Sequence, residues 1–87
     1  MILVGIENCD ACKIAKTFLS DIDYVQLKRG VIGDVSVYVI KKALGKLNKS
    51  GKFPVILSDD LDQIIETDDL MSNLNIEKLR SKLKRTN

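Results

Sequence analysis

The fold is decided by the stretch at residues 2–12, which reads ILVGIENCDAC. Its first half, Ile2 to Ile6, is a short apolar run with little alternation, as is typical of a central strand covered on both faces. Two cysteines, Cys9 and Cys12, follow directly, and apolar residues then recur at helical spacing. The sequence therefore predicts a strand that leads through the cysteine pair into an amphipathic helix. The inner, apolar face of that helix would include Ala11, Ile14, Ala15, Phe18, Leu19 and Ile22, with polar residues on the other face.

The next part of the chain continues the alternation of strands and helices. Residues 24–28 predict a second strand, which is reached through the helical crossover. Asp34 can cap a second helix that runs to about Leu47, although the β-branched run from Val35 to Ile40 leaves a strand open as the alternative. The inner face of that helix would include Val37, Ile40, Leu44 and Leu47.

The last part predicts a hairpin followed by a helical region. Val55-Ile56-Leu57 and residues 63–66 are strands on either side of a polar turn. Asp68 or Asp69 caps the last helical region, with a break or a second cap at residues 73–75. The order β-α-β-α-β-β-α predicts an α/β fold with a four-stranded mixed sheet and helices on both faces.

Length and composition predict an ordinary globular protein. We expect one domain, residues 1–87, and a monomer. The net charge of +2 arises from 14 basic and 12 acidic residues, a balance that does not indicate a nucleic-acid partner. The apolar start at residues 1–6 is too short for a signal peptide or a membrane span, so we expect a cytoplasmic protein with no membrane partner.

The cysteine pair is the strongest chemical signal in the sequence. Two cysteines three positions apart in a reducing compartment favour redox or metal chemistry over a structural disulfide. Cys9 is expected at a helix N-terminus, where unpaired backbone N–H groups stabilise a thiolate that attacks a substrate disulfide. Cys12, one turn later and more buried, would then resolve the mixed disulfide. Glu7 and Asp10 flank Cys9 and oppose its negative charge.

Two other interpretations of the pair stay open. One CxxC supplies two of the four thiolates that a zinc or iron–sulfur site usually needs, and the sequence holds no histidine and no third cysteine. A metal or cluster would therefore need Cys9 from two subunits of a dimer, and we predict no metal site within one chain. In the other interpretation the cysteines have no chemical role and the chain is a non-catalytic interaction domain.

Three segments resemble the glutaredoxin family of the thioredoxin-fold superfamily. Residues 8–13, NCDACK, look like the dithiol active-site segment, with Asp-Ala in place of the familiar Pro-Tyr. Phe53-Pro54-Val55 resembles the cis-proline segment that faces the active cysteine, and Thr67-Asp68-Asp69-Leu70 resembles the run that opens the last helix. The resemblance spans most of the chain. It implies a thioredoxin-like fold and a thiol–disulfide oxidoreductase that acts in electron transport and cell redox homeostasis.

The resemblance also implies four substrate-binding residues, Phe53, Pro54, Thr67 and Asp68. A cis bond at Pro54 would let the backbone of Phe53 pair with a substrate peptide or with glutathione like an added strand. Thr67 and Asp68 would hold the γ-glutamyl end of glutathione. The residues alone leave a trans proline that starts the strand, and an ordinary helix N-cap, open as alternatives.

Two departures from the family pattern bear on the substrate. Ile65-Glu66 replaces the paired glycines that usually precede the Asp-Asp run, and the lysine often found ahead of the cysteines corresponds to Ile6 or Glu7. A negative Glu66 would repel the carboxylate of glutathione. We therefore expect disulfide-containing protein substrates and no tightly bound cofactor. Electrons would come from glutathione as a co-substrate or from a thioredoxin-reductase-like enzyme.

Overall fold

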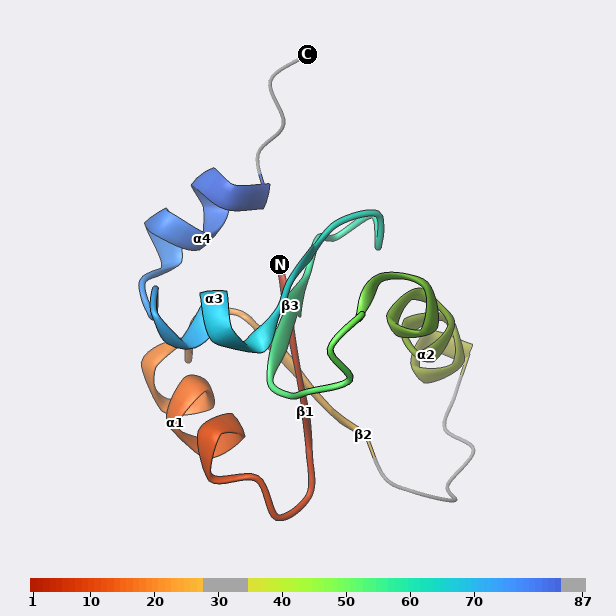
Figure 1. Ribbon diagram of the computed structural model, residues 1–87, viewed down its shortest axis with the longest axis horizontal. Helices are drawn as coiled ribbons and strands as arrows, with labels where there is room; N and C mark the ends of the chain where they lie inside the picture. The colour runs from red at the N-terminus through yellow and green to blue at the C-terminus, as the bar shows by residue number, and fades with distance from the viewer. Residues whose placement is uncertain (28–34, 84–87) are drawn as a thin grey trace.

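The computed structural model of the chain describes residues 1–27 and 35–83. Its sheet has four strands in the order β2-β1-β3-β4 (Figure 1). β1 pairs in parallel with β2 and antiparallel with β3, and β3 pairs antiparallel with β4, so the sheet is mixed. The strands are β1 (Ile2–Ile6), β2 (Asp23–Leu27), β3 (Val55–Leu57) and β4 (Ile64–Ile65).

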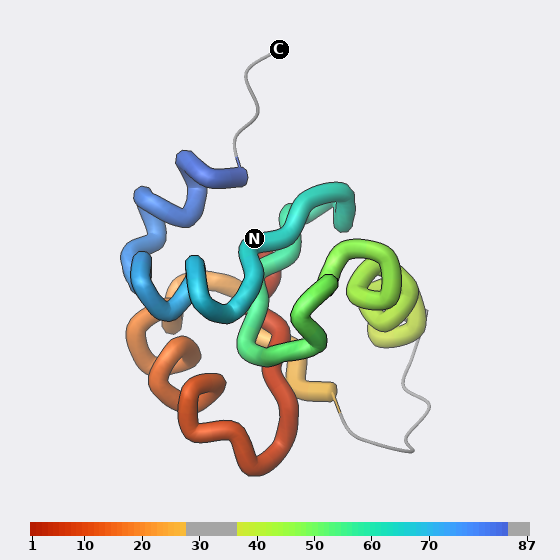
Figure 2. The backbone as a smooth tube through the Cα atoms, in the orientation of Figure 1, coloured from red at the N-terminus to blue at the C-terminus, as the bar shows by residue number. Residues whose placement is uncertain are grey.

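Helices cover both faces of this sheet. They are α1 (Asp10–Phe18), α2 (Val35–Leu47), α3 (Thr67–Met71) and α4 (Ile76–Leu83). The tube in Figure 2 shows α2 on one side of the central strands, with α1, α3 and α4 on the other. Neighbouring residues of β1 point to opposite faces, so Leu3 belongs to the core under α1 and Val4 to the core under α2. This double burial explains why the first strand is apolar without alternation. The strand pairing and the helices on both faces confirm the predicted α/β architecture with a mixed four-stranded sheet.

Residues 35–47 form a helix, so the alternative of a strand at this place is wrong. Ile40, Ala43 and Leu44 are buried and pack against Val4, Val55 and Leu57. Their spacing of three and four residues forms one helical stripe, and burial of that stripe outweighs the strand propensity of the β-branched residues. The predicted cap of this helix, Asp34, lies outside the described residues.

The predicted inner face of α1 is partly wrong. The buried residues on this side are Cys12, Ala15 and Leu19, which follow one another at intervals of three and four. This stripe turns two of the predicted core residues outward, and Ile14 and Phe18 are 46% and 64% exposed. The apolar residues of α1 form two adjoining stripes at helical spacing. Packing against the sheet decides which of the two stripes is buried.

The predicted cap of the last helical region is also wrong. α3 begins at Thr67, and Glu66 occupies the N-cap position without a side-chain cap bond. Asp68 and Asp69 lie in the first turn, where the helix dipole favours negative charge.

The predicted break at residues 73–75 is confirmed. α3 ends at Met71, and Asn75 begins α4 by accepting hydrogen bonds from the backbone N–H groups of Glu77 and Lys78 at 3.0 and 3.2 Å. An asparagine in this position is a favoured N-cap.

None of the helices in the described parts of the chain has both the length and the apolar character needed to cross a bilayer.

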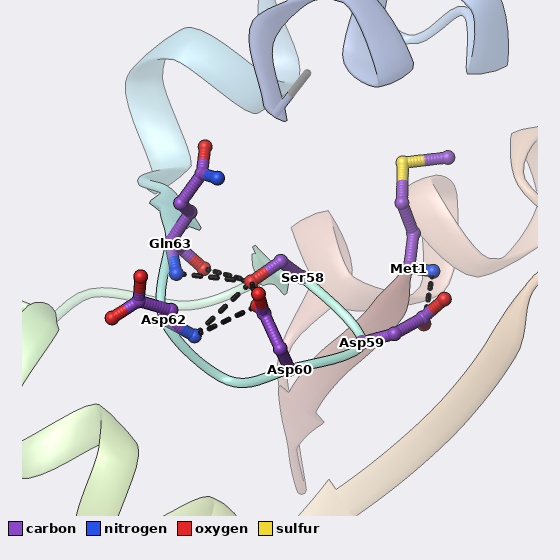
Figure 3. Close-up of polar contacts among 6 residues, drawn as sticks. All are labelled: Met1, Ser58, Asp59, Asp60, Asp62 and Gln63. Atoms are coloured by element: carbon purple, nitrogen blue, oxygen red, sulfur yellow. Dashed lines mark hydrogen bonds and ion pairs between the residues drawn. The ribbon is translucent and has the colours of Figure 1, made fainter. Parts of the chain in front are cut away.

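The turn between β3 and β4 is organised by the hydroxyl of Ser58 (Figure 3). Its Oγ accepts hydrogen bonds from the backbone N–H groups of Asp62 and Gln63 at 3.1 and 3.0 Å, and donates one to Asp60 at 2.6 Å. The bond from Ser58, with a second from the Asp62 N–H, holds the pKa of Asp60 below its ordinary value. The turn thereby fixes the register of the hairpin that leads into α3.

Ser58→Ala should lower the free energy of unfolding by about 1–3 kcal/mol, because the N–H groups of Asp62 and Gln63 lose their common acceptor. Urea unfolding measures the change. The control is Ser81→Ala on the exposed surface of α4, which should stay within about 0.5 kcal/mol of the parent. Equal effects of the two substitutions would show that the Ser58 hydroxyl does not organise the turn.

Candidate redox site

A disulfide joins Cys9 and Cys12 at the start of α1, with the Cα atoms 5.2 Å apart. Cys9 is the N-cap residue of this helix, and its Sγ accepts a hydrogen bond from the backbone N–H of Cys12 at 3.1 Å. The bond uses one of the N–H groups that a helix start leaves unpaired. The predicted position of the cysteine pair at a helix N-terminus is confirmed.

The turn before Cys9 brings the sulfur to this place. β1 ends at Ile6, and Asn8 has a positive φ of 56°, which asparagine tolerates better than most residues. The chain therefore reverses within a few residues and enters α1 at once. As a result Cys9 lies where the strand ends and the helix begins.

The two cysteine residues differ in exposure. Cys12 is 1% exposed and packs on β1, whereas Cys9 is only half-buried. Both line an open pocket of about 320 Å³. An incoming molecule therefore reaches Cys9 more easily than Cys12. The residues that line the pocket are Ile6, Glu7, Asn8, Cys9, Cys12, Lys13, Tyr24 and Gln26.

The segment before β3 lies beside the cysteines. The carbonyl oxygen of Phe53 is 3.9 Å from Sγ of Cys9, and the Phe53–Pro54 peptide bond is cis, the form that the resemblance implies. Pro54 is buried and Phe53 is half-buried. Two of the predicted substrate-binding residues therefore adjoin the accessible sulfur, although 44 positions separate Phe53 from Cys9 in the sequence.

Thr67 is connected to the same segment, and Asp68 is not. The Thr67 hydroxyl donates a hydrogen bond to the carbonyl oxygen of Pro54 at 2.9 Å, and this bond connects α3 to the start of β3. Asp68 is exposed in the first turn of α3, and its side chain enters none of the contacts that join Cys9, Phe53, Pro54 and Thr67. The structure thus brings five of the six predicted site residues together.

Glu66 contacts the loop that precedes β3. Its carboxylate accepts a hydrogen bond from the backbone N–H of Ser50 at 2.8 Å, and this bond holds the pKa of Glu66 below its ordinary value. The residue that was expected to repel glutathione is therefore bonded to the loop at residues 48–52, and it keeps its negative charge at neutral pH.

Sequence reasoning missed Gly5 and Tyr24. A Cβ atom at Gly5 would lie 2.6 Å from the Tyr24 Oη, 3.0 Å from the Cys12 Cβ and 3.1 Å from the Cys12 Sγ. The absent side chain at this strand position is what lets α1 and the tyrosine approach β1. A glycine inside an otherwise apolar strand is a signal for such a close approach, but nothing in the sequence says which residues approach it.

The Tyr24 hydroxyl is a hydrogen-bond donor beside the pocket. It donates to Oε1 of Gln26 at 3.2 Å, and burial raises the pKa of Tyr24, so the hydroxyl keeps its proton. The ammonium of Lys16 lies 4.7 Å from the centre of the tyrosine ring, a cation–π contact that holds the ring against α1.

A comparison with protein-family models, curated proteins and solved structures finds no match for this chain. The interpretation of the site therefore rests on its geometry and on the resemblance of three segments. In the described part of the chain, no three His, Cys, Asp or Glu side chains gather closely enough to hold a metal ion.

Gly5→Ala should lower the free energy of unfolding by about 1–3 kcal/mol, because the new methyl group would overlap the Tyr24 hydroxyl and crowd Cys12. Chemical unfolding of the oxidised protein measures the loss. Tyr24→Phe removes the nearest clashing atom, so the same Gly5→Ala change should cost less in that background. A cost that is unchanged in the double variant would show that the hydroxyl is not what the methyl group meets.

The bond between Ser50 and Glu66 should depend on pH. Because the pKa of Glu66 is lowered in the folded protein, the bond contributes stability above the ordinary glutamic acid pKa and is lost as the pH falls through the lowered value. The Ser50 amide resonance in NMR spectra should titrate with a midpoint below that ordinary pKa. Glu66→Gln keeps an acceptor oxygen without a charge and should abolish this titration. A midpoint at or above the ordinary value would contradict the assignment.

Proposed function

We propose that this chain is a dithiol thiol–disulfide oxidoreductase of the glutaredoxin-like kind, built on a thioredoxin-like fold. The observation that carries the proposal is the Cys9–Cys12 disulfide at the N-cap of α1, with an accessible first sulfur and a buried second one. The order of helices and strands, and the four-stranded mixed sheet that they form, support this fold.

The reaction begins with both cysteines reduced. The Cys9 thiolate attacks one sulfur of a substrate disulfide, so a bond forms between Cys9 and that sulfur while the other substrate sulfur leaves as a thiolate. The N–H of Cys12, which already bonds to Sγ of Cys9, is placed to stabilise negative charge on the attacking atom.

The second step releases the product. Cys12, as a thiolate, attacks Sγ of Cys9 and forms the Cys9–Cys12 disulfide. The substrate sulfur that was bonded to Cys9 leaves as a thiolate and takes up a proton. Two electrons pass from the cysteine pair to the substrate. A thiol donor, either glutathione or a thioredoxin-reductase-like enzyme, returns two electrons and restores the reduced pair.

The segment beside Cys9 is the proposed substrate contact. The backbone of Phe53 can pair with an extended stretch of a protein substrate, and this would bring the substrate disulfide next to Cys9. Thr67 supports the segment through its bond to the Pro54 carbonyl oxygen. Asp68, exposed nearby, is the proposed contact for a substrate ammonium.

Substitution of each cysteine tests the proposal. Cys9→Ser should lower the rate of disulfide reduction at least ~1,000-fold, because the attacking sulfur is lost. Cys12→Ser should instead accumulate a mixed disulfide on Cys9, since the resolving thiol is lost. Reduction of insulin and of a glutathione mixed disulfide, each with glutathione and separately with thioredoxin reductase, measures the rates, and intact-protein mass measures the trapped adduct.

Two results would overturn the proposal. One is an unmodified protein that reduces neither substrate with either electron donor. The other is a Cys9→Ser variant that keeps the full rate. Colour or bound metal in the purified protein, together with dimer formation that depends on Cys9, would favour a cluster-binding module instead.

A further inference from the structure

The resolving sulfur has an unusual requirement when the disulfide opens. Cys12 is 1% exposed, so a thiolate at this position loses most of its contact with water. A buried charge is costly unless a donor group stabilises it. The reduced site therefore needs a hydrogen-bond donor close to Sγ of Cys12.

The Tyr24 hydroxyl is close to that sulfur. The Tyr24 Oη and the Cys12 Sγ both approach the point where Gly5 lacks a Cβ, at 2.6 and 3.1 Å from it, and both residues line the same pocket. Within residues 1–27 and 35–83, the other charged groups that face this place are Glu7 and Lys13, on the pocket wall, and Lys16, above the tyrosine ring.

The Tyr24 hydroxyl can exchange its present hydrogen-bond acceptor, the Gln26 amide, for a stronger one. In the oxidised protein the hydroxyl donates to Gln26, an uncharged amide, across 3.2 Å. A thiolate is a stronger acceptor, because hydrogen bonds to ionised groups are roughly twice as strong as bonds between neutral ones. The raised pKa of Tyr24 supports a role as a donor, since the phenol keeps its proton over the range in which thiols ionise.

We propose that, when the disulfide is reduced, the Tyr24 hydroxyl turns from Gln26 to donate a hydrogen bond to the Cys12 thiolate. Tyr24 is then a positioning residue for the resolving step of the proposed function. It holds the Cys12 sulfur in its ionised form while that sulfur attacks Cys9, and it neither gains nor loses electrons. The inference rests on the proposed function, but its central contact can be measured without turnover.

The first test is the titration of Cys12 in the reduced, full-length chain. NMR of ¹³C-labelled cysteine follows the Cβ resonance of Cys12 as the pH is raised. Tyr24→Phe should raise the midpoint by about one pH unit, the loss expected for one hydrogen bond to an ionised group. The matched control is Tyr38→Phe, which alters the second tyrosine of the sequence, 58% exposed on α2, and should leave the midpoint unchanged.

A second measurement needs no variant and does not depend on whether Tyr24→Phe folds. The Cζ resonance of Tyr24 should shift with the same midpoint as Cys12, while that of Tyr38 does not follow it. Unchanged Cys12 midpoints in Tyr24→Phe, or a Tyr24 resonance that ignores the ionisation of Cys12, would overturn the inference.

Kinetics separate the inference from the proposed function. An aromatic disulfide that releases a coloured thiol reports the attack by Cys9 as a first phase and the resolution by Cys12 as a second. At a pH below the Cys12 midpoint, Tyr24→Phe should leave the rate of the first phase unchanged and slow the second phase roughly threefold. The raised midpoint leaves about tenfold less Cys12 thiolate, but a thiolate of higher pKa is more nucleophilic, which partly offsets the loss. A missing first phase in the unmodified protein counts against the proposed function, whereas two phases at unmodified rates in Tyr24→Phe count against the role of Tyr24 alone.

Discussion

The hydrogen bond from the backbone N–H of Cys12 to Sγ of Cys9 is the contact on which the rest of the site depends. It places the sulfur at the N-cap of α1, where the helix dipole and the unpaired amides favour negative charge. The positive φ of Asn8 reverses the chain direction, so that only a few residues separate the end of β1 from this position. If α1 began one residue later, the N-cap would be Asp10, and the cysteine would lie in the loop.

The pairing of the strands explains why distant residues meet at this sulfur. β1 and β3 are antiparallel, with Val4 opposite Val55, so the end of β1 and the start of β3 share one edge of the sheet. Phe53 and Pro54 precede β3 and Cys9 follows β1, and they therefore adjoin. On the other side β2 runs parallel to β1, with Gln26 opposite Gly5, which brings Gln26 and the hydroxyl of Tyr24 to the place left open by the glycine.

These pairings also explain what the sequence could and could not predict. The bounds of β1 and β3 followed from apolar runs buried on both faces, and the helix start followed from the cysteine pair, because each signal is local. The burial of Ile14 was predicted wrongly, since the choice between two apolar stripes on α1 depends on the sheet beneath. Tyr24 was missed for the same reason: Gly5 signals a close approach, but strand register decides that Tyr24 is the residue that approaches, and the spacing of residues does not show this register.

The arrangement also explains why one helical turn gives its two sulfurs different environments. In the oxidised protein neither sulfur carries charge, so the burial of Cys12 costs little. Reduction creates two thiols, and only Cys9 has both solvent and the start of the helix to stabilise a thiolate. The inward stripe of Cys12, Ala15 and Leu19 is what fixes α1 to the sheet, so Cys12 cannot become more exposed without loosening that packing. A donor on the sheet side of Cys12 is therefore the simplest way for a buried sulfur to stay reactive, and the Tyr24 hydroxyl of β2 lies on that side, beside Gly5.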